Sequence, residues 1–252
     1  MQLYYAPTSP FSRKVRVILR ELGLEKQISE ILIDPWTDEA LRAHNPLSKV
    51  PTLILEDGMA VFESAVICDY LDQLAKSRGI SEGVIPESGP GRLSALKWQG
   101  LADGMMAATA RLYADSQRAE EDRSEAVMER QAEAITSGID AILEGLPGLR
   151  TEEPHLGTWS VLIALYYIDF RWPDRRFDIP VRVRDWMAIM SERESLTETV
   201  FHLPHDNDQK SIAFNRLAVN KAPIKVHNRN NNEISMDSTC RRWLGSRLWR
   251  RK

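Results

Sequence analysis

Cysteine is scarce in this sequence, and long apolar runs are absent. Only two of the 252 residues are cysteines, Cys68 and Cys240, and a pair so far apart argues against a disulfide framework. The longest apolar stretch, residues 158–170, would reach about 20 Å as a helix, against roughly 30 Å for the hydrocarbon core of a membrane. It predicts a buried helix and no membrane span. The first residues lack the basic start and apolar run of a signal peptide, so we expect a cytoplasmic protein.

Surplus positive charge is also missing. The formal net charge is −3, which argues against a general affinity for nucleic acid or acidic surfaces. The charges are unevenly distributed, however. Residues 209–252 hold 11 basic and 2 acidic side chains, whereas residues 1–208 hold 22 basic and 34 acidic ones. The sequence therefore predicts an acidic body followed by a basic appendage.

Asparagine marks the same boundary. Residues 1–208 contain two asparagines and residues 209–252 contain six, and apolar periodicity disappears there. Such a segment buries too little surface to offset its ordering entropy, so we expect a disordered basic tail over residues 206–252. Its last residues interleave tryptophans with arginines, which would suit RNA or an anionic membrane. We favour the alternative of a non-native extension from a fused or frame-shifted coding end, because a run of basic residues supplies positive charge but no folded binding site.

The first 76 residues alternate strand and helix signals. Ser9 can cap a helix that has Pro10 at its first position and ends at Gly23. Ser64 can begin a second helix. Four segments have the pattern of strands, namely residues 3–5, 28–33, 52–55 and 59–62. Strand, helix, strand, hairpin and helix in this order indicate a thioredoxin-like α/β domain over residues 1–76.

Residues 77–91 contain six glycines or prolines, which predicts a linker. Every strong signal after it is helical. Helices are expected over residues 93–114, 127–146, 158–170 and 181–190. The second domain is therefore predicted to be an all-α helical bundle over residues 92–205.

Three short segments carry the chemistry, namely residues 8–14, 45–51 and 63–64. Together they outline a thioredoxin-like domain that holds a small anionic thiol peptide. Ser9 and Ser12 stand where a redox member of this fold carries cysteines. A hydroxyl cannot form a mixed disulfide, and Cys68 lies in the pattern of a buried hydrophobe. Disulfide reductase activity is therefore disfavoured.

Four stretches of the chain resemble bacterial cytosolic glutathione S-transferases. They are LYYAPTSPFSRKVR at residues 3–16, NPLSKVPTL at 45–53, FESAVICDYL at 62–71 and IDFRWPD at 168–174. The resemblance covers roughly residues 1–205. It implies glutathione as a co-substrate without a resident cofactor, a small hydrophobic electrophile as the second substrate, and a homodimer.

The resemblance implies that Ser9 contacts the sulfur of glutathione. The thiolate is the nucleophile, and the reference pKa of a cysteine thiol is about 8.5. The Ser9 hydroxyl would donate a hydrogen bond to the sulfur, and the helix that begins at Pro10 would point its positive end there. Thr8 is the rival donor. By local sequence, Ser9 can equally be a plain N-cap.

The remaining implied glutathione contacts are Phe11, Lys49, Val50, Pro51, Glu63 and Ser64. Val50 would offer its backbone to the cysteinyl unit beside a cis-proline, Pro51. Lys49 would pair with the glycine carboxylate, although it can also be a solvated surface lysine. Ser64 is expected to cap a helix whose amides suit the γ-glutamyl carboxylate, with Glu63 facing the ammonium group.

The second substrate is less well defined. Met105, Met106, Arg111 and Tyr113 lie on the first helix of the bundle, which the resemblance places against the cleft, and they are candidates to line an electrophile pocket. Alternatively, the methionines fill gaps in the core. Residues 202–208 have the composition of a metal cluster, but a proline separates the histidines and we expect no metal site.

One feature departs from the family pattern. Many relatives begin the central helix with a Ser/Thr-x-x-Asp capping box, and His155 and Thr158 occupy those positions here. Histidine is a poor N-cap, so we expect a loss on the order of 1 kcal/mol. The leading hypothesis is a glutathione transferase. The second is a glutathione-binding carrier or interaction protein with little catalysis.

Overall fold

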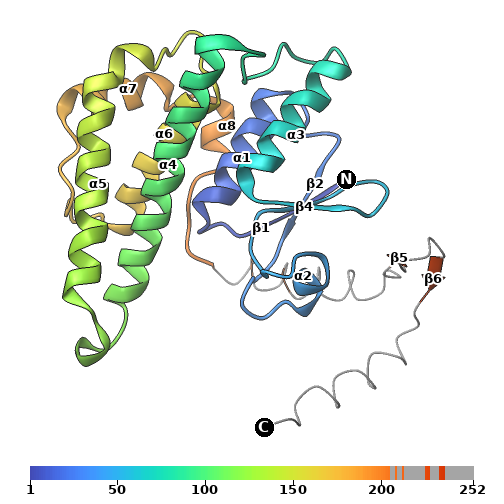
Figure 1. Ribbon diagram of the computed structural model, residues 1–252, viewed down its shortest axis with the longest axis horizontal. Coiled ribbons are helices and arrows are strands. Elements are labelled where there is room, and N and C mark those ends of the chain that lie inside the picture. Colours follow the sequence, from blue (N-terminus) through green and yellow to red (C-terminus); the bar gives the residue numbers. More distant parts are fainter. Residues whose placement is uncertain (205–207, 209–211, 213–224, 228–232, 236–252) are drawn as a thin grey trace.

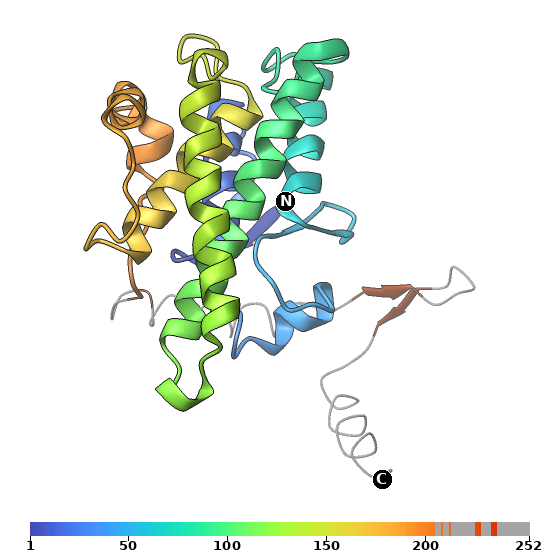
Figure 2. The same ribbon diagram turned by 60° about the vertical axis from the view of Figure 1, so that its left-hand side comes forward.

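The computed structural model describes residues 1–204, 208, 212, 225–227 and 233–235. The N-terminal elements are β1 (Gln2–Tyr5), α1 (Pro10–Glu21), β2 (Ser29–Leu32), α2 (Glu39–His44), β3 (Thr52–Ile54), β4 (Ala60–Phe62) and α3 (Ser64–Ser77). The helices that follow are α4 (Gly89–Ser116), α5 (Glu125–Gly145), α6 (Leu156–Arg171), α7 (Val181–Met190) and α8 (Glu194–Thr197), with short 3-10 turns at Glu120–Asp122 and Leu146–Gly148. Figures 1 and 2 show a small sheet layer beside a layer of long helices.

The N-terminal elements form a four-stranded mixed sheet in the order β2-β1-β3-β4. β1 runs parallel to β2 and antiparallel to β3, and β3 runs antiparallel to β4. Successive side chains of a strand point to opposite faces, and the burial follows this rule. Leu3 and Leu53 join the large core on the side of α1 and α3, whereas Tyr4 and Ile54 pack with Leu41 of α2 on the other side. This is the thioredoxin-like α/β domain that the sequence predicts.

The helical region continues the same core. α6 is buried on nearly every side, with Trp159 and Leu162 completely inaccessible, as its uniformly apolar sequence predicts. α4 and α6 approach closely at Gly157, where an added Cβ would lie 2.6 Å from the Ala95 carbonyl oxygen. Because the buried residues of α1, α3, α4 and α6 belong to one cluster, the helices of the two regions are packed as a single body.

The segment between α3 and α4 is tied to both regions. Asp72 of α3 accepts backbone hydrogen bonds from Val84 at 2.6 Å and Ile85 at 3.0 Å. The Val84 carbonyl in turn accepts from the Leu156 amide at the start of α6, at 2.8 Å. α4 begins at Gly89, inside the segment expected to be a linker, because Pro90 is tolerated in the first helical turn. The domain limits themselves stay a prediction.

The start of α6 corrects one expectation from the sequence. His155 occupies the N-cap, and its Nδ1 accepts a hydrogen bond from the Thr158 amide at 3.1 Å. The cap is therefore present, with an imidazole nitrogen in place of a hydroxyl oxygen. Burial lowers the pKa of His155, which favours the neutral ring that can accept this bond.

Most of the predicted tail lies outside the described residues. Within it, Lys225–His227 (β5) and Glu233–Ser235 (β6) pair as an antiparallel two-stranded ladder, which the sequence pattern did not predict. The predicted disorder of residues 206–252, and the roles considered for their last residues, are untested. No helix among the described residues is both long and apolar enough to cross a membrane.

Candidate active site

The register of the sheet brings the three predicted segments to one edge. Tyr4 of β1 pairs with Thr52 of β3, and Thr52 pairs with Phe62 of β4. Neighbouring strands lie about 4.8 Å apart. The loop after β1, the residue before β3 and the residue after β4 therefore meet within roughly 10 Å. These are the positions of Ser9, Pro51 and Glu63.

Ser9 is the N-cap of α1. Its backbone is extended, its amide donates to the Ala6 carbonyl at 3.1 Å, and its Oγ accepts from the Ser12 amide at 3.1 Å. A serine hydroxyl has one donor as well as two acceptor lone pairs. The cap uses only an acceptor, so the O–H can still donate elsewhere. Capping α1 and donating to a thiol are therefore compatible tasks for one side chain.

The first turns of α1 concentrate positive charge behind Ser9. Arg13 is buried, donates to the Leu196 carbonyl at 3.3 Å, and lies over the Tyr166 and Phe201 rings at 5.1 and 4.5 Å. Burial lowers its pKa to about 10, so it stays cationic at neutral pH. Lys14 is completely buried and pairs with Asp103 of α4 at 2.5 Å. Asp103 balances the charge of Lys14, so Arg13 is the cation of this pair that adds positive charge near the helix start.

The loop before β3 is organised by Asn45. Its Nδ2 donates to the Lys49 carbonyl at 3.1 Å and to Thr52 Oγ1 at 3.0 Å. The Val50–Pro51 peptide bond is cis, as the resemblance predicted. Pro51 is buried and the Lys49 side chain is exposed. Asn45 belongs to the sequence motif, but its positioning role depends on contacts that the sequence does not display.

Glu63 and Ser64 differ in one respect from the expectation. Glu63, not Ser64, holds the N-cap position of α3, with φ 70° and ψ 122° and no side-chain cap hydrogen bond. Ser64 is the first helical residue and is buried. A positive φ at a non-glycine residue costs about 1–3 kcal/mol. This strain is what lets the chain turn sharply from β4 into α3, so the cap position falls one residue earlier than expected.

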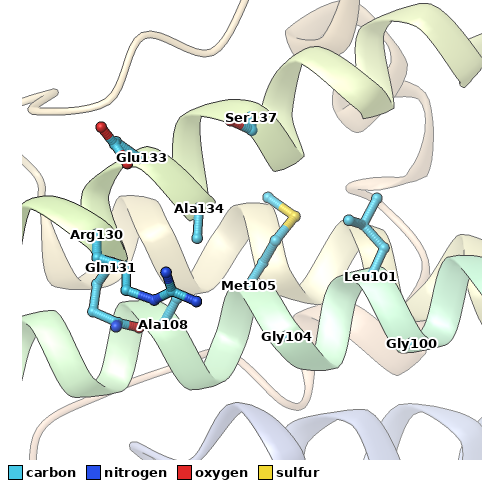
Figure 3. Close-up of a pocket in the computed structure, with 10 residues that line it drawn as sticks. All are labelled: Gly100, Leu101, Gly104, Met105, Ala108, Arg130, Gln131, Glu133, Ala134 and Ser137. Carbon is cyan, nitrogen blue, oxygen red and sulfur yellow. The ribbon is translucent and has the colours of Figure 1, made fainter. Parts of the chain in front are cut away.

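The four candidates for an electrophile pocket are not brought together. Met105 and Met106 are 2% and 0% exposed, and Figure 3 shows Met105 pointing from α4 toward α5, where a groove of about 580 Å³ lies. Arg111 is exposed and pairs with Asp115 at 2.8 Å. Tyr113 lies on the side of the N-terminal region, since the guanidinium of Arg171, which bonds the Thr8 carbonyl, lies over its ring at 4.4 Å. The methionines pack as core residues.

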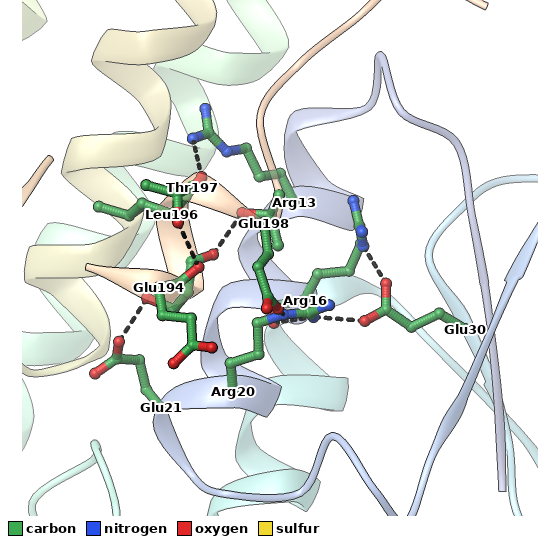
Figure 4. A network of polar contacts seen from close by, with 11 residues as sticks. Arg13, Arg16, Arg20, Glu21, Glu30, Glu194, Leu196, Thr197 and Glu198 are labelled. Atoms are coloured by element: carbon green, nitrogen blue, oxygen red, sulfur yellow. Dashed lines mark hydrogen bonds and ion pairs between the residues drawn. The ribbon is translucent and has the colours of Figure 1, made fainter. Parts of the chain in front are cut away.

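Polar contacts also fix α1 against α8 (Figure 4). Arg20 pairs with Glu198 at 2.8 Å, and Glu21 pairs with Arg193 at 2.7 Å. Ser195 donates a further hydrogen bond to Glu21 at 2.5 Å. Neither α8 nor these pairs could be predicted from the sequence, because the pairs join residues more than 170 positions apart. They hold the end of α1 and leave its start, at Ser9, facing the site.

Two other predicted features have no part in the site. Cys68 is completely buried, and burial raises its pKa to about 12, so its thiol is inert at neutral pH. His202 lies 3.3 Å from Asp208, whereas residues 205–207 lie outside the described part of the chain. Within that part, no three histidine, cysteine or acidic residues gather as a metal site would require.

Comparison with known proteins agrees with this geometry. Residues 8–74 match the family described as glutathione S-transferase, N-terminal domain. The chain is 32% identical over 175 residues to YibF, an uncharacterized GST-like protein of Escherichia coli. The aligned region covers 68% of this chain and 83% of YibF. The chain belongs to the glutathione S-transferase family.

Solved structures of other glutathione transferases have the same architecture. A family member from Pseudomonas fluorescens with bound glutathione is 32% identical, with a TM-score of 0.73 over 80% of this chain and 99% of its own. The glutathione S-transferase of Methylobacterium radiotolerans, solved with glutathione sulfonate, is 28% identical, with a TM-score of 0.72 over 81% and 96% of the two chains. The Pseudomonas fluorescens protein was also solved with S-(propanoic acid)-glutathione, at 31% identity and a TM-score of 0.69 over 79% and 97% of the two chains.

Proposed function

We propose that this glutathione S-transferase family member binds glutathione and activates its thiol for attack on a hydrophobic electrophile. The observation that carries the proposal is the hydroxyl of Ser9. It caps α1 through its oxygen and keeps a hydrogen to donate, at a helix start that holds no cysteine. Thiol activation, rather than thiol exchange, is the chemistry that these groups support.

The energies are adequate for this task. Lowering the thiol pKa by two units requires about 2.7 kcal/mol. A hydrogen bond to a charged group contributes roughly 1.5–3 kcal/mol, and a helix N-terminus about 0.3–1 kcal/mol. Ser9 and the 12-residue helix α1 would together supply the shift, with the charge of Arg13 adding to it. The thiolate would then displace a leaving group or add to a polarised double bond.

Glutathione would lie along the sheet edge. Val50, beside its cis-proline, would pair with the cysteinyl backbone, and Lys49 would face the glycine carboxylate. The first turn of α3 at Ser64 would receive the γ-glutamyl carboxylate, with Glu63 toward the ammonium group. Phe11 is half-buried in the first turn of α1 and would border the thiol. Relatives solved with glutathione and its derivatives support this assignment.

The decisive experiment measures the thiol itself. We expect glutathione bound to the protein to show ultraviolet thiolate absorbance at a pH one to two units below that of free glutathione, on the order of the shift argued above. Ser9→Ala should return the titration toward that of the free peptide, whereas Thr8→Val should not. A bound thiol that titrates as in solution would instead support the second hypothesis, a glutathione carrier with little catalysis.

We also propose that the protein is a homodimer. Val66 of α3 and Leu93 of α4 are 54% and 71% exposed. Asp69 of α3 and Arg92 of α4 form an ion pair at 3.4 Å, so the parts of the two helices that carry Val66 and Leu93 lie near each other. Exposed apolar side chains that cluster on one face are typical of an interaction surface. A second copy of the chain is the partner that the family resemblance implies.

A further inference from the structure

Arg171, the last residue of α6, is surrounded by aromatic rings. Its guanidinium carbon lies 4.4 Å from the ring centroid of Tyr113, 4.8 Å from that of Phe170 and 5.2 Å from that of Tyr167. The residue is half-buried. A cation held among aromatic faces is attracted to their electron-rich surfaces while it loses part of its hydration. The charge is therefore fixed in position and remains accessible from one side.

The hydrogen bonds of Arg171 use only part of its donor capacity. Nε donates to the Tyr167 hydroxyl at 3.1 Å, and Nη2 donates to the Thr8 carbonyl at 3.4 Å. An arginine has five N–H donors. Within the part of the chain that the structure describes, no carboxylate pairs with Arg171. By contrast, Arg184 on the neighbouring helix α7 forms a bidentate ion pair with Asp169. A half-buried guanidinium without a carboxylate is suited to bind one from a ligand.

The position of Arg171 decides which ligand. Thr8 immediately precedes Ser9, so the guanidinium lies beside the start of α1, where the thiol would be activated. The residues proposed for glutathione all belong to the N-terminal region, whereas Arg171 reaches the site from α6. It therefore faces the place of the second substrate, on the side of the helical region.

We propose that Arg171 selects electrophiles that carry a carboxylate, with their hydrocarbon part against the Tyr113 and Phe170 rings. This inference rests on the proposed function and adds the substrate class: unsaturated carbonyl compounds with an acidic end. The carboxylate would form a charge-assisted hydrogen-bonded pair with the free edge of the guanidinium. Bound there, it holds the reacting carbon next to the thiolate, so the pair acts by positioning.

The reaction with such a substrate is a balanced addition. The sulfur of the thiolate forms a bond to the alkene carbon β to the ketone. The carbon–carbon π bond breaks, and its electron pair moves onto the ketone oxygen as an enolate. A proton from water then adds to the neighbouring carbon and balances the proton that the thiol released. The product is one thioether, and no oxidant or reductant takes part.

The test compares 3-benzoylacrylate with 3-benzoylacrylamide, which have the same shape and differ in charge. With glutathione, we expect the wild-type protein to give a higher kcat/KM for the acid, after correction for the uncatalysed rates. Arg171→Gln should reduce the acid-to-amide ratio about 10-fold to 100-fold, mainly through KM for the acid, because it removes a charged hydrogen-bonding partner. Arg171→Lys should recover part of it. Arg176→Gln removes an equal charge near Trp172 and is the matched control, which should keep the ratio.

The ratio separates recognition from structural damage, since misfolding would slow both substrates equally. An unchanged ratio in Arg171→Gln overturns the inference, as does a rise in KM for glutathione alone, which would assign the guanidinium to that peptide. Turnover of the amide together with the thiol titration tests the proposed function separately. If neither substrate reacts, the dissociation constants of the two thioether products can be measured by calorimetry instead. The inference requires the wild-type protein to bind the acid product more tightly than the amide product, and equal affinities would overturn it.

Discussion

The Nζ of Lys14 lies 2.5 Å from Oδ1 of Asp103 and joins the first helix of the sheet region to the first helix of the bundle. Lys14 has no solvent exposure and Asp103 retains about a quarter. Burial raises the pKa of Asp103, and Lys14 opposes that rise. The pair therefore fixes the relative position of α1 and α4 just over one turn after the cap at Ser9, and its loss should affect both stability and the site.

Asp103→Asn should destabilise the protein by about 3–5 kcal/mol, because it leaves the Lys14 ammonium buried without a counter-charge. Replacing both residues, by Lys14→Met with Asp103→Leu, should recover most of that loss. Urea unfolding followed by circular dichroism gives the two values. Asp69→Asn breaks an exposed pair with Arg92 and, as the control, should cost less than about 1 kcal/mol. A double variant as unstable as the single one would show that the pair is not the cause.

Ser9 allows its two tasks to be measured apart. Ser9→Asp keeps an N-cap acceptor for the Ser12 amide, so its stability should stay within a few tenths of a kcal/mol of the wild type. It places a negative charge at the sulfur, however, and should raise the bound thiol pKa above that of free glutathione. Ser9→Ala should lose about 1 kcal/mol of stability together with the thiol shift. Thiol titration and thermal unfolding of the two variants provide both readouts, and equal stability losses would contradict the capping role.

Acidification should act through His155. Its pKa in the folded protein is lowered by burial from the reference 6.5, so the unfolded chain takes up the proton first as pH falls. The stability that the neutral cap contributes is complete above pH 6.5 and is lost as pH falls below it, by at most about 1.4 kcal/mol per pH unit. His155→Asn keeps a capping acceptor without a titration. Its unfolding free energy between pH 7 and pH 5 should fall less steeply than that of the wild type.

His44 is the internal comparison for this measurement. Burial lowers its pKa as well, and it remains in both proteins, so the difference in slope isolates His155. His44→Gln should remove a separate part of the slope. If His155→Asn and the wild type lose stability in parallel, the cap does not titrate in this range.

Close approach of α4 and α6 predicts a contrast between two glycines. Gly157→Ala would place a Cβ 2.6 Å from the Ala95 carbonyl oxygen and from Trp98 Cβ. A backbone oxygen cannot move aside without shifting the whole of helix α4. We expect a loss of about 1–3 kcal/mol, as for other overpacked cores. Gly100→Ala has open space and should stabilise α4 by up to about 1 kcal/mol. Unfolding midpoints that move in the same direction for both would contradict the packing described.

The proposed dimer has its own test. Leu93→Glu and Val66→Glu place a charge on the apolar face and should shift the protein to monomers in light scattering, with little change in monomer stability because both positions are exposed. Val181→Glu, at 75% exposure on α7, is the matched control and should leave the oligomeric state unchanged. A wild-type protein that is monomeric at all concentrations would refute the proposal.

Local signals in the sequence were sufficient for the elements that local chemistry controls. Ser9 with Pro10 marked the start of α1, and the apolar stretch after Thr158 marked the buried helix α6. The sequence did not indicate the short helices α2 and α8. α2 depends on an Asp38 cap that accepts two amide hydrogens, and α8 is only four residues long, so neither has a periodicity that stands out. Their stability comes from packing against partners elsewhere in the chain.

The sequence by itself determined which groups could activate a thiol: a serine without neighbouring cysteines, at the first turn of a helix. Only the tertiary structure decided how the groups meet. Sheet register placed Ser9, Pro51 and Glu63 at one edge, and the end of α6 brought Arg171 to Thr8 across more than 160 residues of chain. Helix capping acts between neighbours and is therefore visible in sequence, whereas the partner of a charged side chain depends on the fold that buries it.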